Sequence, residues 1–142
     1  MQKQLLTSKN QHHNTPDKIL NLVRKFGDIT VDPCSNKDSI VNAKISYDGT
    51  LKDGLSEPWA GHNGNKGGII FVNPPYKGQL PWIKKCVDTF YRCQDEQIFL
   101  LVPARTDTKN FHDWIYPSAD KICLIKGRIS FWLDGQEQDG AP

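Results

Sequence analysis

Apolar residues recur along the chain in two patterns, one typical of amphipathic helices and one typical of buried strands. Thr15-Pro16-Asp17 is a favourable helix start, and helical spacing continues from there to an expected stop at Gly27. Similar stretches predict helices over 80–91 and 109–116, and we also expect a short helix over 37–43. The apolar residues of the first helix are Ile19, Leu20, Leu22, Val23 and Phe26.

Short, continuously apolar runs separate these helices and predict strands. The expected strands cover 28–31, 44–47, 68–72, 97–102, 121–125 and 129–133, the last two as a hairpin or as one bent strand around Gly127. Apolar strands that alternate with helices are typical of a mostly parallel sheet with helices on both faces. The sequence therefore predicts an α/β fold.

Three of the predicted strands end at Asp32, Asn73 and Pro103. In parallel sheets of this kind, ligands bind beyond the carboxyl ends of the strands. We therefore expect these three positions to lie on one edge of the sheet, at the binding site.

The length of 142 residues fits one domain, expected over 15–142 after a mobile polar lead-in at 1–14. The net charge is only +2, but basic residues concentrate in 3–25 and acidic ones in 134–142, which indicates either a basic patch or a solvated surface. No signal peptide or membrane-spanning run is present, so a cytoplasmic location is expected.

Metal binding is not expected, because neither the cysteines nor the histidines show ligand spacing. The four cysteines are Cys34, Cys86, Cys93 and Cys123. We interpret them as reduced residues that fill the core.

The motif that carries chemistry is Asn73-Pro74-Pro75-Tyr76, directly after the strand predicted over 68–72. The exocyclic amine of adenine is a poor nucleophile, because its lone pair is delocalised into the ring. An Asn side-chain oxygen and the next residue's carbonyl oxygen can accept its two hydrogens and free the lone pair. Prolines fix the backbone, and an aromatic ring can stack on a base pulled out of the duplex.

The chain resembles the phage and prophage N6-adenine DNA methyltransferases (Dam-like), a branch of the Rossmann-like class I methyltransferases. The resemblance covers nearly all of residues 15–132. The segments that carry it are Thr15-Pro16, 26–35, 53–55, Trp59, 73–76, Trp82-Ile83, 101–108 and 127–131. It implies transfer of a methyl group from S-adenosylmethionine to the N6 amine of adenine in DNA.

Site residues follow from this resemblance in three groups. The catalytic group is Asn73, Pro74, Pro75 and Tyr76. The cofactor-binding group is Thr15, Pro16, Asp32, Pro33, Cys34, Asp48, Asp53 and Leu55. The substrate-binding group on the DNA side is Tyr76, Lys77, Arg105, Thr106, Asp107 and Arg128.

Several of these residues also have a plain structural interpretation. Thr15 is an ordinary helix cap as well as a candidate cofactor contact, and both can hold. Asp48 and Asp53-Gly54 are typical of turns, and Arg105 and Arg128 are candidates for structural ion pairs. Members of the family continue past Gly140-Ala141-Pro142 with a last strand, so either this chain is truncated or its sheet is one strand short.

Other functions remain open at this point. The same motif suits methylation of the N4 amine of cytosine or of glutamine side chains in proteins, because a primary amide poses the same chemical problem. A different class of function is a truncated or degenerate homologue that binds DNA or cofactor without turnover. Binding of the cofactor distinguishes this last case from the enzymes.

Overall fold

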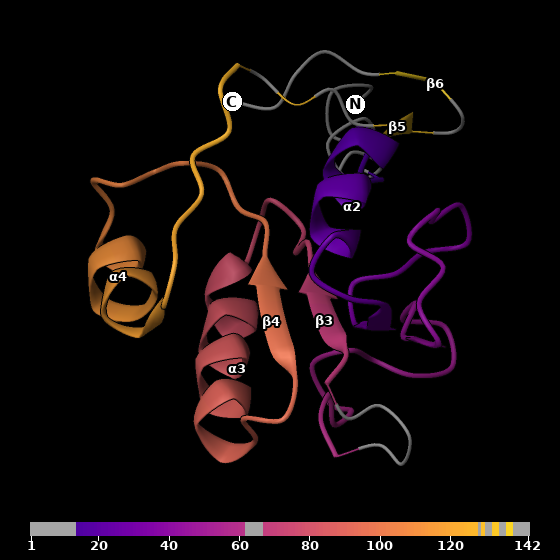
Figure 1. The fold of residues 1–142 in the computed structure, drawn as a ribbon, viewed down its shortest axis with the longest axis horizontal. Coiled ribbons are helices and arrows are strands. Elements are labelled where there is room, and N and C mark those ends of the chain that lie inside the picture. Colours follow the sequence, from indigo (N-terminus) through magenta and orange to yellow (C-terminus); the bar gives the residue numbers. More distant parts are fainter. Residues whose placement is uncertain (1–13, 62–66, 128, 130–131, 134–135, 138–142) are drawn as a thin grey trace, which may run out of the picture.

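A parallel four-stranded sheet forms the centre of the molecule (Figure 1). The structure is a computed structural model that describes residues 14–61, 67–127, 129, 132–133 and 136–137. The strands are β1 (Ile29–Asp32), β2 (Ile45–Ser46), β3 (Ile69–Val72) and β4 (Gln97–Leu100), in the order β2-β1-β3-β4. Every neighbouring pair is parallel, so the carboxyl ends of all four strands meet at one edge. The expected α/β fold is confirmed.

Helices precede β1 and flank β4 as the sequence pattern predicted, whereas no helix of the described residues lies between β1, β2 and β3. The helices are α2 (Asp17–Arg24), α3 (Gln79–Arg92), the π-helical turn η1 (Phe111–Ile115) and α4 (Tyr116–Ser118), which continues η1. A short antiparallel pair follows, β5 (Trp132–Leu133) with β6 (Gln136–Glu137). The buried apolar face of α2 is narrower than expected. Leu22 and Phe26, two apolar residues predicted to belong to it, are 46% and 61% exposed.

Helices cover both faces of the sheet, and each face has its own apolar core. The core under α2 consists of Leu20, Val23, Ile29, Val41, Ile69 and Phe71. The core under α3 consists of Val31, Tyr47, Trp59, Ile70, Val72 and Cys86, with Trp82 packed against it. Because β1 and β3 contribute to both cores, their residues are buried throughout.

An irregularity in β1 explains how this strand serves both cores. Ile29 and Val31 are two residues apart, which normally places side chains on the same face. Here the register against β3 shifts between them, so that one packs under each helix. The Thr30 hydroxyl donates to the Ile69 carbonyl oxygen at 3.2 Å, and a Cβ on Gly68 would lie 2.3 Å from Thr30 Cγ2. Glycine at position 68 therefore makes room for the shifted strand.

Two sequence-based expectations are wrong. Residues 37–43 form a turn and irregular chain, not a helix. There the side chains of Asn36 and Ser39 accept hydrogen bonds from the backbone N–H groups of Asp38 and Val41 at 2.9 and 3.3 Å. Such local bonds compete with the helical ladder.

The second wrong expectation is a strand over 121–125. This segment pairs with no other strand of the described chain, and Leu124 is 72% exposed. Of the strand expected over 129–133, only Trp132–Leu133 forms one, while residues 128, 130–131 and 138–142 lie outside the described residues. The expectation that the sheet is one strand short therefore stays a prediction. None of the described helices is long and apolar enough to cross a membrane.

Candidate active site

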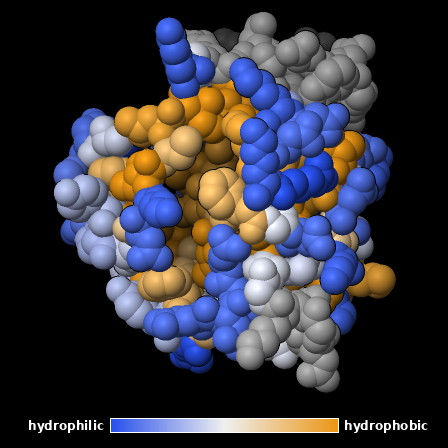
Figure 2. Space-filling model, in the orientation of Figure 1, coloured by the Kyte–Doolittle hydropathy of each residue, from blue (hydrophilic) through white to orange (hydrophobic). Residues whose placement is uncertain are grey.

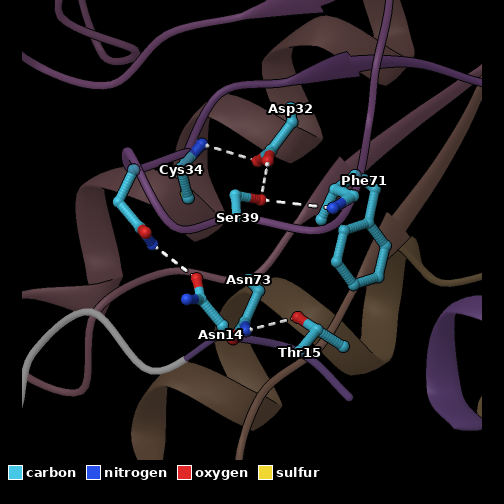
Figure 3. A pocket seen from close by; sticks show the side chains of 9 residues that line it. Asn14, Thr15, Asp32, Cys34, Ser39, Phe71 and Asn73 are labelled. Atoms are coloured by element: carbon cyan, nitrogen blue, oxygen red, sulfur yellow. Dashed lines mark hydrogen bonds between the residues drawn. The ribbon is translucent and has the colours of Figure 1, made fainter. Parts of the chain in front are cut away.

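A polar pocket opens at the carboxyl edge of the sheet, between the ends of β1 and β3 (Figure 3). Four residues predicted from the sequence line it: Thr15, Asp32, Cys34 and Asn73. The other lining residues, which the sequence did not indicate, are Asn14, Asn36, Ser39, Val41 and Phe71. The parallel sheet thus brings Asp32 and Asn73 together as expected, although 41 positions separate them.

A hydrogen bond connects the candidate catalytic Asn73 to the segment before α2. Its Nδ2 donates to Thr15 Oγ1 at 2.8 Å (Figure 3). Thr15 is only 3% exposed. The expectation that Thr15 caps α2 is wrong, because Pro16 is the N-cap and no side chain forms a capping hydrogen bond there. The Pro16 carbonyl oxygen accepts from the N–H groups of Ile19 and Leu20, so the chain is held on both sides of this contact.

Asp32 supplies a buried carboxyl group to the same pocket. It accepts hydrogen bonds from the backbone N–H of Cys34 at 3.2 Å and from the Ser39 hydroxyl at 3.3 Å. Burial outweighs these bonds and raises the pKa of Asp32 from 3.8 to about 6. Within the described residues, the ion pairs are Arg92–Asp88 and Lys109–Asp113, so no basic side chain there neutralises Asp32. The pocket therefore favours a ligand that carries positive charge.

The turn after β1 contacts both β3 and the helix α3. The Cys34 thiol faces the backbone N–H of Asn73 and lies near Cys86 of α3. Burial, followed by the negative charge of Asp32, raises the pKa of the Cys34 thiol, so it stays protonated and unreactive. The expected core role is confirmed for Cys86, which is buried, and is wrong for Cys123, which is exposed; Cys34 and Cys93 are half-buried.

Asn14 is a site residue that the sequence interpretation placed in the lead-in. It is buried, its Nδ2 donates to the Asp38 carbonyl oxygen at 3.0 Å, and its Oδ1 accepts from Asn36 at 2.7 Å. These bonds attach the chain before α2 to the loop after β1. An isolated Asn in a polar stretch gives no sequence signal for such a role. The remaining lead-in, residues 1–13, lies outside the described part of the chain.

A second loop, carrying Asp53 and Leu55, packs against the turn after β1. A Cβ on Gly54 would lie 1.9 Å from the Pro33 carbonyl oxygen, so only glycine fits this approach. Lys85 of α3 donates to the carbonyl oxygens of Gly54, Leu55 and Glu57. Partial burial lowers the pKa of Lys85.

Two tryptophan side chains also hold the loop that carries Asp53 and Leu55. The Trp59 Nε1 donates to the Gly54 carbonyl oxygen at 2.7 Å, and the Trp59 ring stacks on Trp82 with centroids 6.1 Å apart. The Lys85 ammonium group lies 5.0 Å from the Trp59 ring centroid. Both tryptophans and Lys85 therefore hold the loop in place, a role that the sequence did not reveal for Lys85.

The two other candidate cofactor carboxylates are exposed and sit in turns. Asp48 Oδ1 accepts from the backbone N–H and the hydroxyl of Thr50 at 2.9 and 2.6 Å, and these bonds lower its pKa. Asp53 accepts from Leu55 N–H at 3.2 Å and from the Ser56 hydroxyl at 2.9 Å. Neither residue lines the pocket, and the contacts of both are those of turn-forming residues.

The Asn-Pro-Pro-Tyr motif leads from β3 into α3. Pro74 is buried, whereas Pro75 and Tyr76 are half-buried, and burial raises the pKa of the Tyr76 phenol. Gly78, the N-cap of α3, has the left-handed conformation with φ 72°. Glycine adopts this conformation without strain, which allows the helix to begin directly after the motif.

The expected DNA-side residues lie on exposed surface. Lys77 is exposed beside the motif, and Arg105, Thr106 and Asp107 are exposed in the loop after β4. Figure 2 shows a hollow with hydrophobic residues in the part of the view where Figure 1 draws the start of α3 and the chain after β4. Arg128 lies outside the described residues. Arg105 takes part in neither of the ion pairs among the described residues. Those contacts therefore do not support a structural ion-pair role for Arg105.

No group of three or more His, Cys, Asp or Glu side chains in the described residues could hold a metal ion.

Comparison with known proteins gives one match. A sequence model of the family described as DNA N-6-adenine-methyltransferase (Dam) matches residues 2–141. No curated protein and no solved structure matches the chain. Since the family match extends over nearly the whole chain, the chain belongs to the DNA N-6-adenine-methyltransferase (Dam) family, whose activity is N6 methylation of adenine in DNA with S-adenosylmethionine as methyl donor.

Proposed function

We propose that the pocket between β1 and β3 is the active site of this methyltransferase and that Asn73-Pro74-Pro75-Tyr76 holds the target adenine. The observation that carries the proposal is the hydrogen bond from Asn73 to the buried Thr15, beside the buried carboxyl group of Asp32. This places the one motif with suitable chemistry next to a site that suits a positively charged ligand.

The polar groups of the pocket suit the positively charged part of S-adenosylmethionine. That cofactor carries positive charge on its sulfur and on its amino group, and Asp32 is the buried carboxyl group of the pocket. Thr15 and Cys34 line the pocket with Asp32, Pro16 and Pro33 are their neighbours in the chain, and Leu55 lies on the loop whose Gly54 packs against Pro33. When bound, the cofactor supplies an electrophilic methyl group on sulfur.

Asn73 and Pro74 activate the adenine amine in this proposal. The Asn73 Oδ1 and the Pro74 carbonyl oxygen each accept one N6 hydrogen, which pulls the nitrogen toward tetrahedral geometry. Its lone pair would then take the methyl group that bound S-adenosylmethionine would supply, and the N6 proton displaced in this step would pass to solvent. Tyr76 supplies the ring on which the base stacks.

DNA approaches from the exposed side of the site. A base inside a duplex cannot reach the pocket, so the target adenine must leave the stack, at a cost of a few kcal/mol. Lys77 and Arg105 are exposed and can contact phosphates, while Thr106 and Asp107 can form polar contacts beside the base. We assign Arg128 to the same surface from the family resemblance alone.

The test uses unmethylated DNA, tritiated S-adenosylmethionine and the purified chain, with Asn73→Ala as the inactive control. The DNA is digested to nucleosides, and the labelled nucleoside is identified. We expect label in N6-methyladenine, lost in Asn73→Ala. Label in N4-methylcytosine or in protein glutamine would contradict the assigned substrate, and bound cofactor without any label would favour a homologue without turnover.

A further inference from the structure

We infer that Thr15 is a positioning residue for methyl transfer: its hydroxyl group accepts a hydrogen bond from the Asn73 amide nitrogen and so holds that side chain in place, with its carbonyl oxygen directed away from Thr15. The inference rests on the proposed catalytic role of Asn73. It concerns a contact between residues 58 positions apart in the chain.

The amide group of Asn73 needs such a partner because its two ends are similar in size and opposite in function. The oxygen accepts hydrogen bonds, whereas the NH₂ group only donates them. A flipped amide would present N–H groups to the hydrogens of the adenine amine, which need an acceptor. In the structure, Nδ2 lies 2.8 Å from Thr15 Oγ1, so the oxygen is directed away from Thr15.

Thr15 can hold the amide because it is itself held. It is 3% exposed, and the neighbouring Asn14 is 8% exposed. Asn14 is attached to the loop after β1 through Asp38 and Asn36, and α2 begins two residues after Thr15. A hydroxyl group on a mobile segment would move with the amide. One anchored between a loop and a helix holds the amide nitrogen at a fixed position.

The experiment compares Thr15→Val, which removes the hydroxyl group at nearly constant shape, with Thr15→Ser, which keeps it. Thr30→Val is the matched control, because Thr30 is also buried and its hydroxyl donates to a backbone carbonyl oxygen away from the pocket. The readouts are kcat, the Kd for S-adenosylmethionine, and the NMR signals of the Asn73 side-chain amide in ¹⁵N-labelled protein.

We expect Thr15→Val to lower kcat about tenfold, as expected for the loss of one hydrogen bond of about 1.4 kcal/mol in the transition state. Its Kd for the cofactor should change less than twofold, and its Asn73 amide protons should exchange faster with solvent. Thr15→Ser should restore both properties, and Thr30→Val should keep them.

Three results would overturn the inference: wild-type kcat in Thr15→Val, no rescue by Thr15→Ser, or a Kd for the cofactor that rises in parallel with the loss of kcat. The last result would make Thr15 a cofactor contact only. If the wild-type chain forms no N6-methyladenine, the proposed function fails instead, and the NMR signals still report whether the Thr15–Asn73 contact exists.

Discussion

The two sides of the sheet's carboxyl edge differ in burial: one is held by buried polar contacts, and the other is exposed chain. At the ends of β1 and β3, buried polar groups hold one another: Asn14 with Asn36, Thr15 with Asn73, and Asp32 with Ser39. Beyond β4, the chain is exposed from Arg105 to Asp107 and again from 119 to 127. If these are the cofactor side and the DNA side, as we propose, the first is prearranged in the free protein and the second is left open for the substrate to cover. Substitutions on the first side should therefore cost stability, and those on the second should cost only DNA affinity.

The largest expected effect is that of Gly54→Ala. The added Cβ would lie 1.9 Å from the Pro33 carbonyl oxygen. Because that oxygen belongs to the backbone, the clash can be relieved only by moving the whole loop. We expect a loss of about 3 kcal/mol or more in the free energy of unfolding, measured by urea titration. Gly49→Ala is the control, since nothing lies within 4 Å of its Cβ and only its φ of +81° adds strain, about 1 kcal/mol. Equal losses in the two variants would contradict tight packing at Gly54.

The next effect is a pH dependence that arises from Asp32. Its pKa is 3.8 when solvated and about 6 in the fold, so the folded state binds the proton more tightly between these values. Stability is therefore fully present below about pH 4 and falls as pH rises through about 6, by about 2–3 kcal/mol. Urea titrations at several pH values should show this fall in the wild-type chain and lose it in Asp32→Asn.

Cofactor binding should show the opposite trend with pH. A positively charged ligand favours the ionised form of Asp32, so the affinity for S-adenosylmethionine should rise as pH increases through about 6 in the wild-type chain. Asp32→Asn should bind more weakly and without this slope. A wild-type affinity that stays constant from pH 5 to pH 7 would argue against contact between Asp32 and the cofactor.

Lys85→Met should cost about 2 kcal/mol in the free energy of unfolding, because three backbone carbonyl oxygens lose their donor. Met keeps the length of the side chain, so packing against Trp59 changes little. Lys84→Met is the control on the same helix, since Lys84 is exposed and lies 5.0 Å from the Trp114 ring centroid. If the two variants lose the same stability, Lys85 does not anchor the loop.

The sequence predicted the fold where burial alone determines structure. Continuous apolar runs identified β1, β3 and β4, and the parallel arrangement then placed Asp32 and Asn73 on one edge. The expected strand over 121–125 is wrong because an apolar run becomes a strand only when a partner strand supplies hydrogen bonds. Periodicity describes one segment and contains no information about that partner.

The site was predicted less completely, because much of it depends on polar contacts between distant segments. Asn14 and Ser39 are ordinary polar residues by their position in the sequence, and only the fold brings them to the pocket. Lys85 was missed for the same reason, since a lysine on a helix is usually solvated. The expected helix over 37–43 is wrong because Asn36 and Ser39 bond to the backbone locally, a competition that helix spacing does not report.

The smallest expected effect on stability tests the open side of the comparison. Arg105→Ala should change the free energy of unfolding by less than about 0.5 kcal/mol, because the residue is exposed. Its KM for DNA should rise about three- to tenfold, and the slope of log affinity against log salt concentration should fall by about one, as expected for one lost phosphate contact. Lys52→Ala, an equally exposed basic residue on the loop after β2, should change neither quantity. A stability loss in Arg105→Ala as large as that in Lys85→Met would remove the contrast between the two sides, because the DNA side would then be built into the free protein as well.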